Sequence, residues 1–189
     1  MAGWGGLLIK VCWIAWVAVW SGGWLYNLAR GPRARTTTFQ WTGLAILAAV
    51  LLTERMGGLA GAVRFRGPVP AAAGAVVLVG GTAFTLWARA VLGRMWSSVP
   101  AVKEAHQLRT AGPYAVTRHP IYTGMLAMVL GTLLMDGRLS TLLGAVAFLV
   151  YILVKMRVEE RLMVATFGDG YLAYRRRTPQ LVPWTRRLR

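Results

Sequence analysis

Residues suited to binding an anionic ligand gather at one turn of the chain, around His119. Gly112 and Pro113 form a predicted turn. Pro120 suits the first position of a helix, where no backbone donor is needed. The free N–H groups at a helix start, with the positive end of the helix dipole, favour a carboxylate. His119 lies beside that start and Tyr122 one turn further in. The sequence therefore predicts a basic, aromatic pocket rich in hydrogen-bond donors.

A second group of ionisable residues follows the last apolar segment, from Lys155 to Arg161. Ionisable residues at the edge of a membrane segment are costly and usually face a cavity or one another. Lys155 and Glu159 are four residues apart, so on a helix they share a face and can pair. Glu160 lies about 100° round the helix from Glu159, given 3.6 residues per turn. We therefore expect Glu159 to take part in chemistry, and we interpret Glu160 and Arg161 as members of ordinary ion pairs among the lipid headgroups.

Aromatic residues surround a predicted helix break near the C-terminal end. Gly168-Asp169-Gly170 interrupts the helix, with Phe167 before it and Tyr171 and Tyr174 after it. These rings could cap a pocket, although Tyr174 is equally typical of the aromatic belt at a membrane interface.

The composition places these groups in a membrane protein. Hydrophobic residues make up 56% of the 189 residues, charged residues only 15%, and the nine Trp suit a bilayer interface. Apolar segments of sufficient or nearly sufficient length predict an all-α polytopic protein with about five transmembrane helices, the last two forming a hairpin. The expected segments are 7–28, 39–52, 69–92, 121–135 and 139–156.

The third segment is rich in small residues. We expect Gly74, Gly80 and Gly81 to let neighbouring helices approach closely. The chain is interpreted as a single domain, 1–189, with N-terminal helices in 1–92 and a catalytic half in 93–189. Its one cysteine, Cys12, excludes an internal disulfide and a multi-cysteine metal site, and we expect a small buried hydrophobe there.

Positive charge predicts the orientation in the membrane. The formal charge of +16 falls mainly in the first loop, the 93–120 loop and the C-terminal tail. These parts share one side of a five-span protein, which the positive-inside rule places in the cytoplasm. Basic loops against anionic lipid headgroups explain the charge better than nucleic-acid binding does. The compact chain suggests a bacterial inner membrane, and the sequence does not set the oligomeric state.

Several of these elements together resemble the isoprenylcysteine carboxyl methyltransferase family and its phospholipid methyltransferase relatives. The similar elements are the run H-x-L-x-x-x-G-x-Y-x-x-x-R-H-P-x-Y-x-G from His106 to Gly124, the paired Glu, and F-G-x-x-Y-x-x-Y-x-x-x-x-P from Phe167 to Pro179. The resemblance covers roughly 93–183, about half of the chain.

The resemblance implies a helical membrane enzyme that binds S-adenosylmethionine in a cytoplasmic pocket formed by the 93–120 loop and the C-terminal segment. The family's catalytic arginine and glutamate fall on Lys155 and Glu159, and either Lys155 or Arg157 takes the role of the arginine. Cofactor contacts fall on His106, Gln107, Leu108, Arg109, Tyr114, His119, Pro120, Ile121 and Tyr122.

Two positions depart from the family pattern. Lys155 keeps the charge of the family arginine but loses its planar, two-pronged grip on a carboxylate, and Val99 replaces a polar cofactor contact. The expected reaction is methyl transfer to a lipophilic acceptor, first of all the carboxylate of an isoprenylcysteine-like substrate. A phospholipid amine, a small thiol or another lipid is an alternative acceptor, and a non-catalytic membrane scaffold is the alternative outside enzymes.

Overall fold

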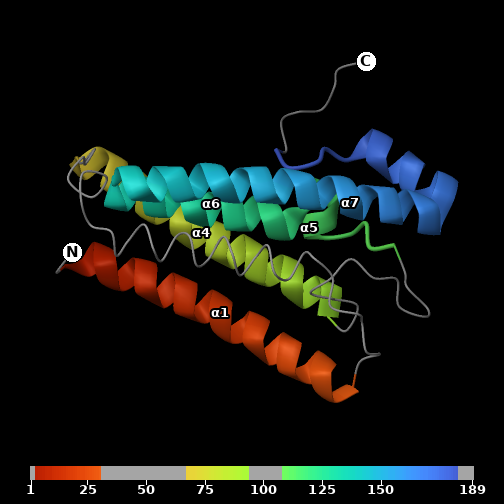
Figure 1. The fold of residues 1–189 in the computed structure, drawn as a ribbon, viewed down its shortest axis with the longest axis horizontal. Coiled ribbons are helices and arrows are strands. Elements are labelled where there is room, and N and C mark those ends of the chain that lie inside the picture. The colour runs from red at the N-terminus through yellow and green to blue at the C-terminus, as the bar shows by residue number, and fades with distance from the viewer. Residues whose placement is uncertain (1–2, 31–66, 94–107, 183–189) are drawn as a thin grey trace.

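The computed structural model describes residues 3–30, 67–93 and 108–182, and this part of the chain is helical without a β-strand. The all-α expectation is therefore confirmed for these residues. The expected segment 39–52 lies outside the described residues. The elements are α1 (Trp4–Arg30), α4 (Pro68–Leu92), the short α5 (Pro113–Val116), α6 (Pro120–Asp136) and α7 (Leu139–Arg177) (Figure 1).

Three of the described helices are long and apolar enough to cross a membrane, namely α1, α4 and α7. Helix α6 is apolar but has 17 residues, fewer than the ~20 that a hydrocarbon core of ~30 Å requires. Large apolar side chains such as Leu7, Ile14 and Val150 are exposed on the outer surfaces of α1 and α7. Such surfaces suit contact with lipid.

Helices α4 and α6 form the closest pair, and they run antiparallel. Gly74 of α4 lies against Gly131 of α6, and Gly81 lies against Gly124. A Cβ atom built on any of these four glycines would come within 2.9 Å of atoms of the partner helix, backbone atoms included. Two of the three predicted contact glycines are thus confirmed. Gly80 is not one of them, because it points away from α6 and a Cβ there would meet nothing within 4 Å.

A small apolar core joins this pair to α1. Cys12 of α1 is buried with Leu78 of α4 and with Met128 and Met135 of α6. Trp13 adds a hydrogen bond from its indole nitrogen to the Thr132 hydroxyl at 3.1 Å. The interpretation of Cys12 as a small buried hydrophobe is confirmed.

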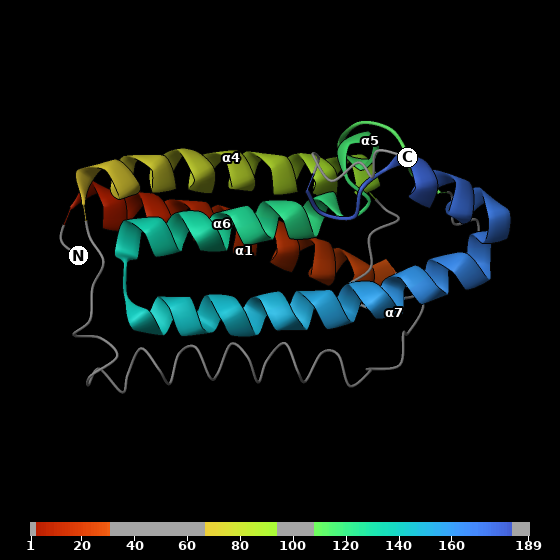
Figure 2. The same ribbon diagram turned by 90° about the horizontal axis from the view of Figure 1, so that it is seen from above.

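The expected hairpin of the last two apolar segments is present as α6 and α7. Gly137 ends α6 in the left-handed conformation, with φ of 63° and ψ of 21°, which glycine adopts without steric cost. The Thr141 hydroxyl donates to Asp136 at 2.7 Å across the turn. The hairpin sets α7 running back along α6 toward the end of the molecule where α6 begins (Figure 2).

Helix α7 extends well past its apolar part and then changes direction. Gly168 has φ of 51° and ψ of −127°, so the predicted break is confirmed as a kink inside α7. After the kink the chain turns back toward α5 and the start of α6 (Figure 2). This return brings residues from the end of the chain onto the turn that contains His119.

We predict that Gly81→Ala destabilises the protein, because its new methyl group would lie 2.8 Å from the Gly124 carbonyl oxygen and 2.9 Å from the Met128 nitrogen. Overpacking of this kind costs about 1–3 kcal/mol. The neighbouring Gly80→Ala is the matched control, since it meets no atom and gains up to about 1 kcal/mol of helix propensity. Thermal unfolding in detergent measures both. Equal midpoints for the two variants would contradict the close helix contact.

Candidate functional site

Helix α4 fixes the position of the α6 start. The buried Thr85 hydroxyl donates to the Ile121 carbonyl oxygen at 3.1 Å. Pro120 opens α6, as predicted, and His119 occupies the N-cap position with no capping hydrogen bond from its side chain. Because the His119 side chain does not cap the helix, its imidazole can contact residues of α7.

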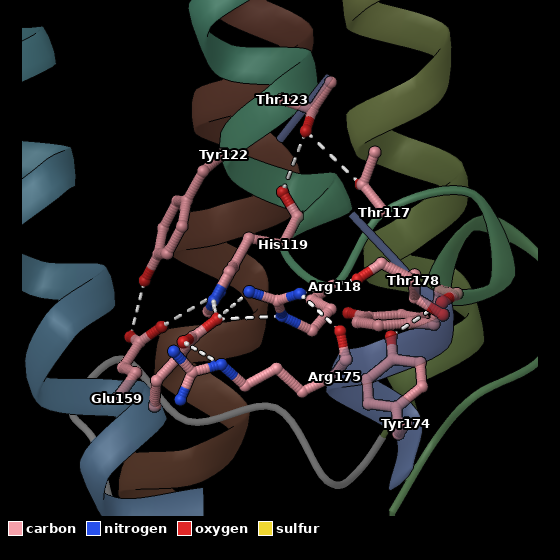
Figure 3. A network of polar contacts seen from close by, with 11 residues as sticks. Thr117, Arg118, His119, Tyr122, Thr123, Glu159, Tyr174, Arg175 and Thr178 are labelled. Carbon is pink, nitrogen blue, oxygen red and sulfur yellow. Dashed lines mark hydrogen bonds and ion pairs between the residues drawn. The ribbon is translucent and has the colours of Figure 1, made fainter. Parts of the chain in front are cut away.

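The ring of His119 joins Tyr122 and Glu159 in one cluster (Figure 3). Its ring stacks on Tyr122 with centroids 5.6 Å apart. The Tyr122 hydroxyl donates a short 2.5 Å hydrogen bond to Glu159 Oε1, and His119 Nδ1 lies 3.7 Å from Glu159 Oε2. Lys155 Nζ lies 5.5 Å from the centre of the Tyr122 ring, within reach of a cation–π attraction. Lys155 and Glu159 thus share a helix face, as predicted, and both meet Tyr122.

Glu160 binds the other side of the same histidine. Glu160 Oε1 accepts a hydrogen bond from Arg118 Nε at 2.9 Å and forms an ion pair with Arg118 Nη2 at 2.8 Å, and it lies 3.3 Å from His119 Nε2. Arg175 Nε lies 3.7 Å from Glu160 Oε2. The expectation of an ordinary ion pair among headgroups is wrong, because the Glu160 side chain is only 10% exposed. Glu160 and Glu159 lie on opposite sides of the His119 ring, each facing a different ring nitrogen.

The C-terminal segment, residues 178–182, lies across the turn before α6. The backbone N–H groups of Arg118 and His119 donate to the carbonyl oxygens of Pro179 and Gln180, at 2.8 and 3.2 Å. The Thr123 hydroxyl donates to the Leu181 carbonyl oxygen at 2.9 Å. Arg118 Nη1 also donates to the Thr178 carbonyl oxygen at 2.5 Å. Pairing between these two short stretches holds the segment in place.

Tyrosines from the end of α7 complete the packing. Tyr171 and Tyr174 are both buried, and the Tyr174 hydroxyl donates to the Tyr114 carbonyl oxygen at 2.6 Å. The interfacial-belt alternative for Tyr174 is therefore wrong. Burial, with Tyr174 and Glu159 nearby, raises the pKa of the Tyr114 phenol, so this hydroxyl stays protonated at neutral pH and remains a hydrogen-bond donor.

The other predicted site residues differ from the cluster in their exposure. Arg157 is exposed, since it lies about 200° round α7 from Glu159. Arg109 is also exposed, and Leu108 is partly buried in irregular chain before α5. His106 and Gln107 lie outside the described residues.

Sequence reasoning missed the roles of Arg118 and Glu160. Both stand beside residues that it selected, because Arg118 precedes His119 and Glu160 follows Glu159. The available signal was the lack of other acids. The chain holds only six Asp and Glu residues in total, against 22 Lys and Arg. Two adjacent acids at a membrane edge therefore indicate specific cationic partners.

The comparison with known families now bears on this site. A model of the phospholipid methyltransferase family matches residues 69–170, more than half of the chain. The chain belongs to this family. The match includes α4, α5, α6 and the part of α7 that carries both glutamates. The expected relationship to membrane methyltransferases is confirmed.

Named relatives are similar over shorter stretches. The protein-S-isoprenylcysteine O-methyltransferase of Schizosaccharomyces pombe is 36% identical over 94 residues, covering 48% of this chain and 40% of that protein. Methanethiol S-methyltransferase 2 of Bradyrhizobium diazoefficiens is 44% identical over 75 residues, covering 40% of this chain and 28% of the relative. The matches thus span less than half the length of either relative.

A solved structure shares the fold. It is the eukaryotic intramembrane Ras methyltransferase ICMT, with a TM-score of 0.56 and 18% identity, covering 82% of this chain and 55% of the other. The likeness shows a common helical membrane fold.

Proposed function

We propose that the protein transfers a methyl group from S-adenosylmethionine to a lipophilic acceptor at the edge of the membrane. One observation carries the proposal: His119, Tyr122 and Glu159 come together from α6 and α7, within the residues that match the family. The similar proteins named as methyltransferases act on an isoprenylcysteine and on methanethiol, and both names support a methyl acceptor that favours an apolar environment.

The residues of the cluster fit S-adenosylmethionine chemically. This cofactor carries a sulfonium and an ammonium group beside a carboxylate, and when bound it supplies an electrophilic methyl group. Glu159 is the more exposed of the two glutamates, with 22% of its side chain accessible, and carboxylates and tyrosine rings both attract cations. Tyr114, His119 and Tyr122 line the same end of the bundle. In our proposal they hold the cofactor, together with His106, Gln107, Leu108, Arg109, Pro120 and Ile121.

The chain's own contribution is alignment. Tyr122 donates to Glu159 and fixes the direction of its carboxylate, while Lys155 brings a positive charge to the same side of α7. We assign Lys155 and Glu159 to orienting the acceptor, and we favour Lys155 over the exposed Arg157. Holding two reactants in line in a site that excludes water supplies a large part of a rate enhancement.

We predict that His119→Ala lowers the affinity for S-adenosylmethionine by about 10–100-fold, the usual effect of losing a hydrogen bond to a charged group. Isothermal titration calorimetry in detergent measures the affinity, with thermal unfolding as a check on the fold. Unchanged affinity would remove His119 from the cofactor site. A wild-type protein that binds no cofactor would support a non-catalytic scaffold instead.

Two classes of methyl acceptor suit the proposed site. A carboxylate, as in an isoprenylcysteine, is ionised at neutral pH and needs no base. A thiol is the second candidate, favoured by lysine at position 155, which cannot clamp a carboxylate with two parallel hydrogen bonds. For a thiol acceptor, Glu159 is placed to accept the proton.

We predict that Glu159→Gln lowers kcat/KM with either acceptor, and that pH separates the two classes. With a thiol the loss is roughly 10²–10⁴-fold, as for a missing general base, and the remaining rate rises with pH as the thiol ionises by itself. With a carboxylate the remaining rate is flat above neutral pH.

A labelled-methyl assay over prenylated cysteine, alkyl thiol and phospholipid amine acceptors measures these rates. Asp169→Asn is the matched control, because Asp169 is exposed beyond the kink of α7 and its substitution removes the same charge. Full activity of Glu159→Gln with every acceptor that the wild type methylates would exclude Glu159 from the reaction.

We also propose that the site faces the cytoplasm, in a bacterial inner membrane. The ends of α1 and α4, helix α5 and the start of α6 lie at the same end of the molecule (Figure 1). That end carries Arg89, Arg118 and the run 175–177, and positive charge favours the cytoplasmic side.

We predict opposite exposure of the two ends of the molecule to a membrane-impermeant thiol reagent. In a background without Cys12, Arg176→Cys should be labelled only after the cells are opened, and Gly3→Cys should be labelled in intact cells. Both positions are exposed. The reverse pattern would overturn the orientation.

A further inference from the structure

Glu160 stands out among the charged residues because it contacts three separate parts of the chain and has no role in the proposed reaction. It lies on α7 and binds Arg118 before α6, His119 at the α6 start, and Arg175 after the kink. We propose that Glu160 is a positioning residue that holds the C-terminal segment and the His119 ring in the arrangement that binds the cofactor. This inference rests on the proposed function.

The first step of the argument concerns Arg118. Its side chain is 9% exposed. Nε donates to Glu160 and Nη2 forms an ion pair with it, while Nη1 donates to the Arg175 and Thr178 carbonyl oxygens. Because a guanidinium stays charged, Glu160 supplies the negative charge that permits its burial. Without that charge, Arg118 would favour solvent and release both carbonyl groups.

The second step concerns the backbone of the same residue. The Arg118 and His119 N–H groups donate to Pro179 and Gln180, so any outward movement of Arg118 also strains the pairing with the C-terminal segment. Glu160 therefore controls the segment through Arg118. Neither of the other acids near the end of α7 can substitute, because Glu159 lies beside Tyr122 and faces the other ring nitrogen of His119, and Asp169 is exposed.

The third step concerns His119. Glu160 faces Nε2 of the ring at 3.3 Å, which directs Nδ1 toward Glu159, at 3.7 Å. Because Glu160 holds the imidazole at Nε2, the direction of Nδ1 is fixed as well. Glu160 thus links closure of the C-terminal segment to the orientation of a proposed cofactor ligand, and cofactor binding should in turn stabilise the closed segment.

Hydrogen exchange of the full chain in detergent tests the link to the segment. In Glu160→Gln, the Arg118 and His119 amides should exchange at least tenfold faster than in the wild type. Glu159→Gln, one residue away with the same change of charge, should leave these amides protected. Unchanged exchange in Glu160→Gln would overturn the proposal.

Calorimetry and kinetics test the link to the cofactor. Glu160→Gln should weaken S-adenosylmethionine binding at least tenfold and raise its KM, with kcat at saturating cofactor within about threefold of the wild type. Saturating cofactor should also slow the exchange of the Arg118 and His119 amides again. Faster exchange with unchanged cofactor affinity would reduce Glu160 to a fold-stabilising residue and overturn the proposal.

A milder variant covers the case in which Glu160→Gln fails to fold. Arg118→Lys keeps the charge opposite Glu160, but one ammonium cannot reach Glu160 and the Thr178 carbonyl oxygen with a planar fork. It should show the same two changes to a smaller extent, and wild-type values for both would overturn the proposal. Failure of the proposed function itself would give a different result, because the wild-type protein would then bind no cofactor.

Discussion

The ion pair between Arg118 and Glu160 is the contact on which the arrangement of the site depends. Each side chain is about one-tenth exposed, so each charge has lost most of its water and must be compensated by the other and by further hydrogen bonds. On the arginine side, Nε and Nη1 donate hydrogen bonds and Nη2 forms an ion pair with Glu160. Because these acceptors belong to α7 and to the C-terminal segment, satisfying one buried charge fixes the relative position of three parts of the chain.

Such a pair requires a rigid frame, since its partners are 42 residues apart in the chain. The glycine contacts between α4 and α6 provide that frame by setting the level of the α6 start, and the turn at Gly137 sets the direction of α7. The kink at Gly168 then supplies the reversal. A straight α7 would carry Tyr174 away from Tyr114 and would leave Arg118 without the carbonyl group of Thr178.

The sequence predicts the parts of this structure that depend on local pattern. Hydropathy and the conformational preferences of proline and glycine predict the helix bounds near 69–92 and 121–135, the proline at the α6 start and the break at Gly168.

Helical periodicity also places Lys155 and Glu159 on one face. It does not predict the contacts of Glu160, because a helical wheel gives directions round one helix but does not show what surrounds it. Arg118 and His119, from the turn before α6, surround the glutamates of α7, and the C-terminal segment pairs with that turn; neither contact is visible in the sequence of α7 alone. Gly80 failed for a related reason, since composition does not identify the face of α4 that meets α6.

The two adjacent glutamates have different surroundings. These surroundings alone, without any family resemblance, suggest different roles for the two residues. Glu160 has one oxygen shared by Arg118 and His119 and the other near Arg175, so it has little capacity left for a ligand. Glu159 receives one phenol hydrogen bond, is about twice as accessible, and lies beside Lys155 and the Tyr122 ring. A carboxylate oxygen can accept more than one hydrogen bond, so Glu159 can keep its bond to Tyr122 and still contact a cationic or protic ligand. This difference supports assigning the proposed chemistry to Glu159, which has unused capacity, and the proposed positioning role to Glu160.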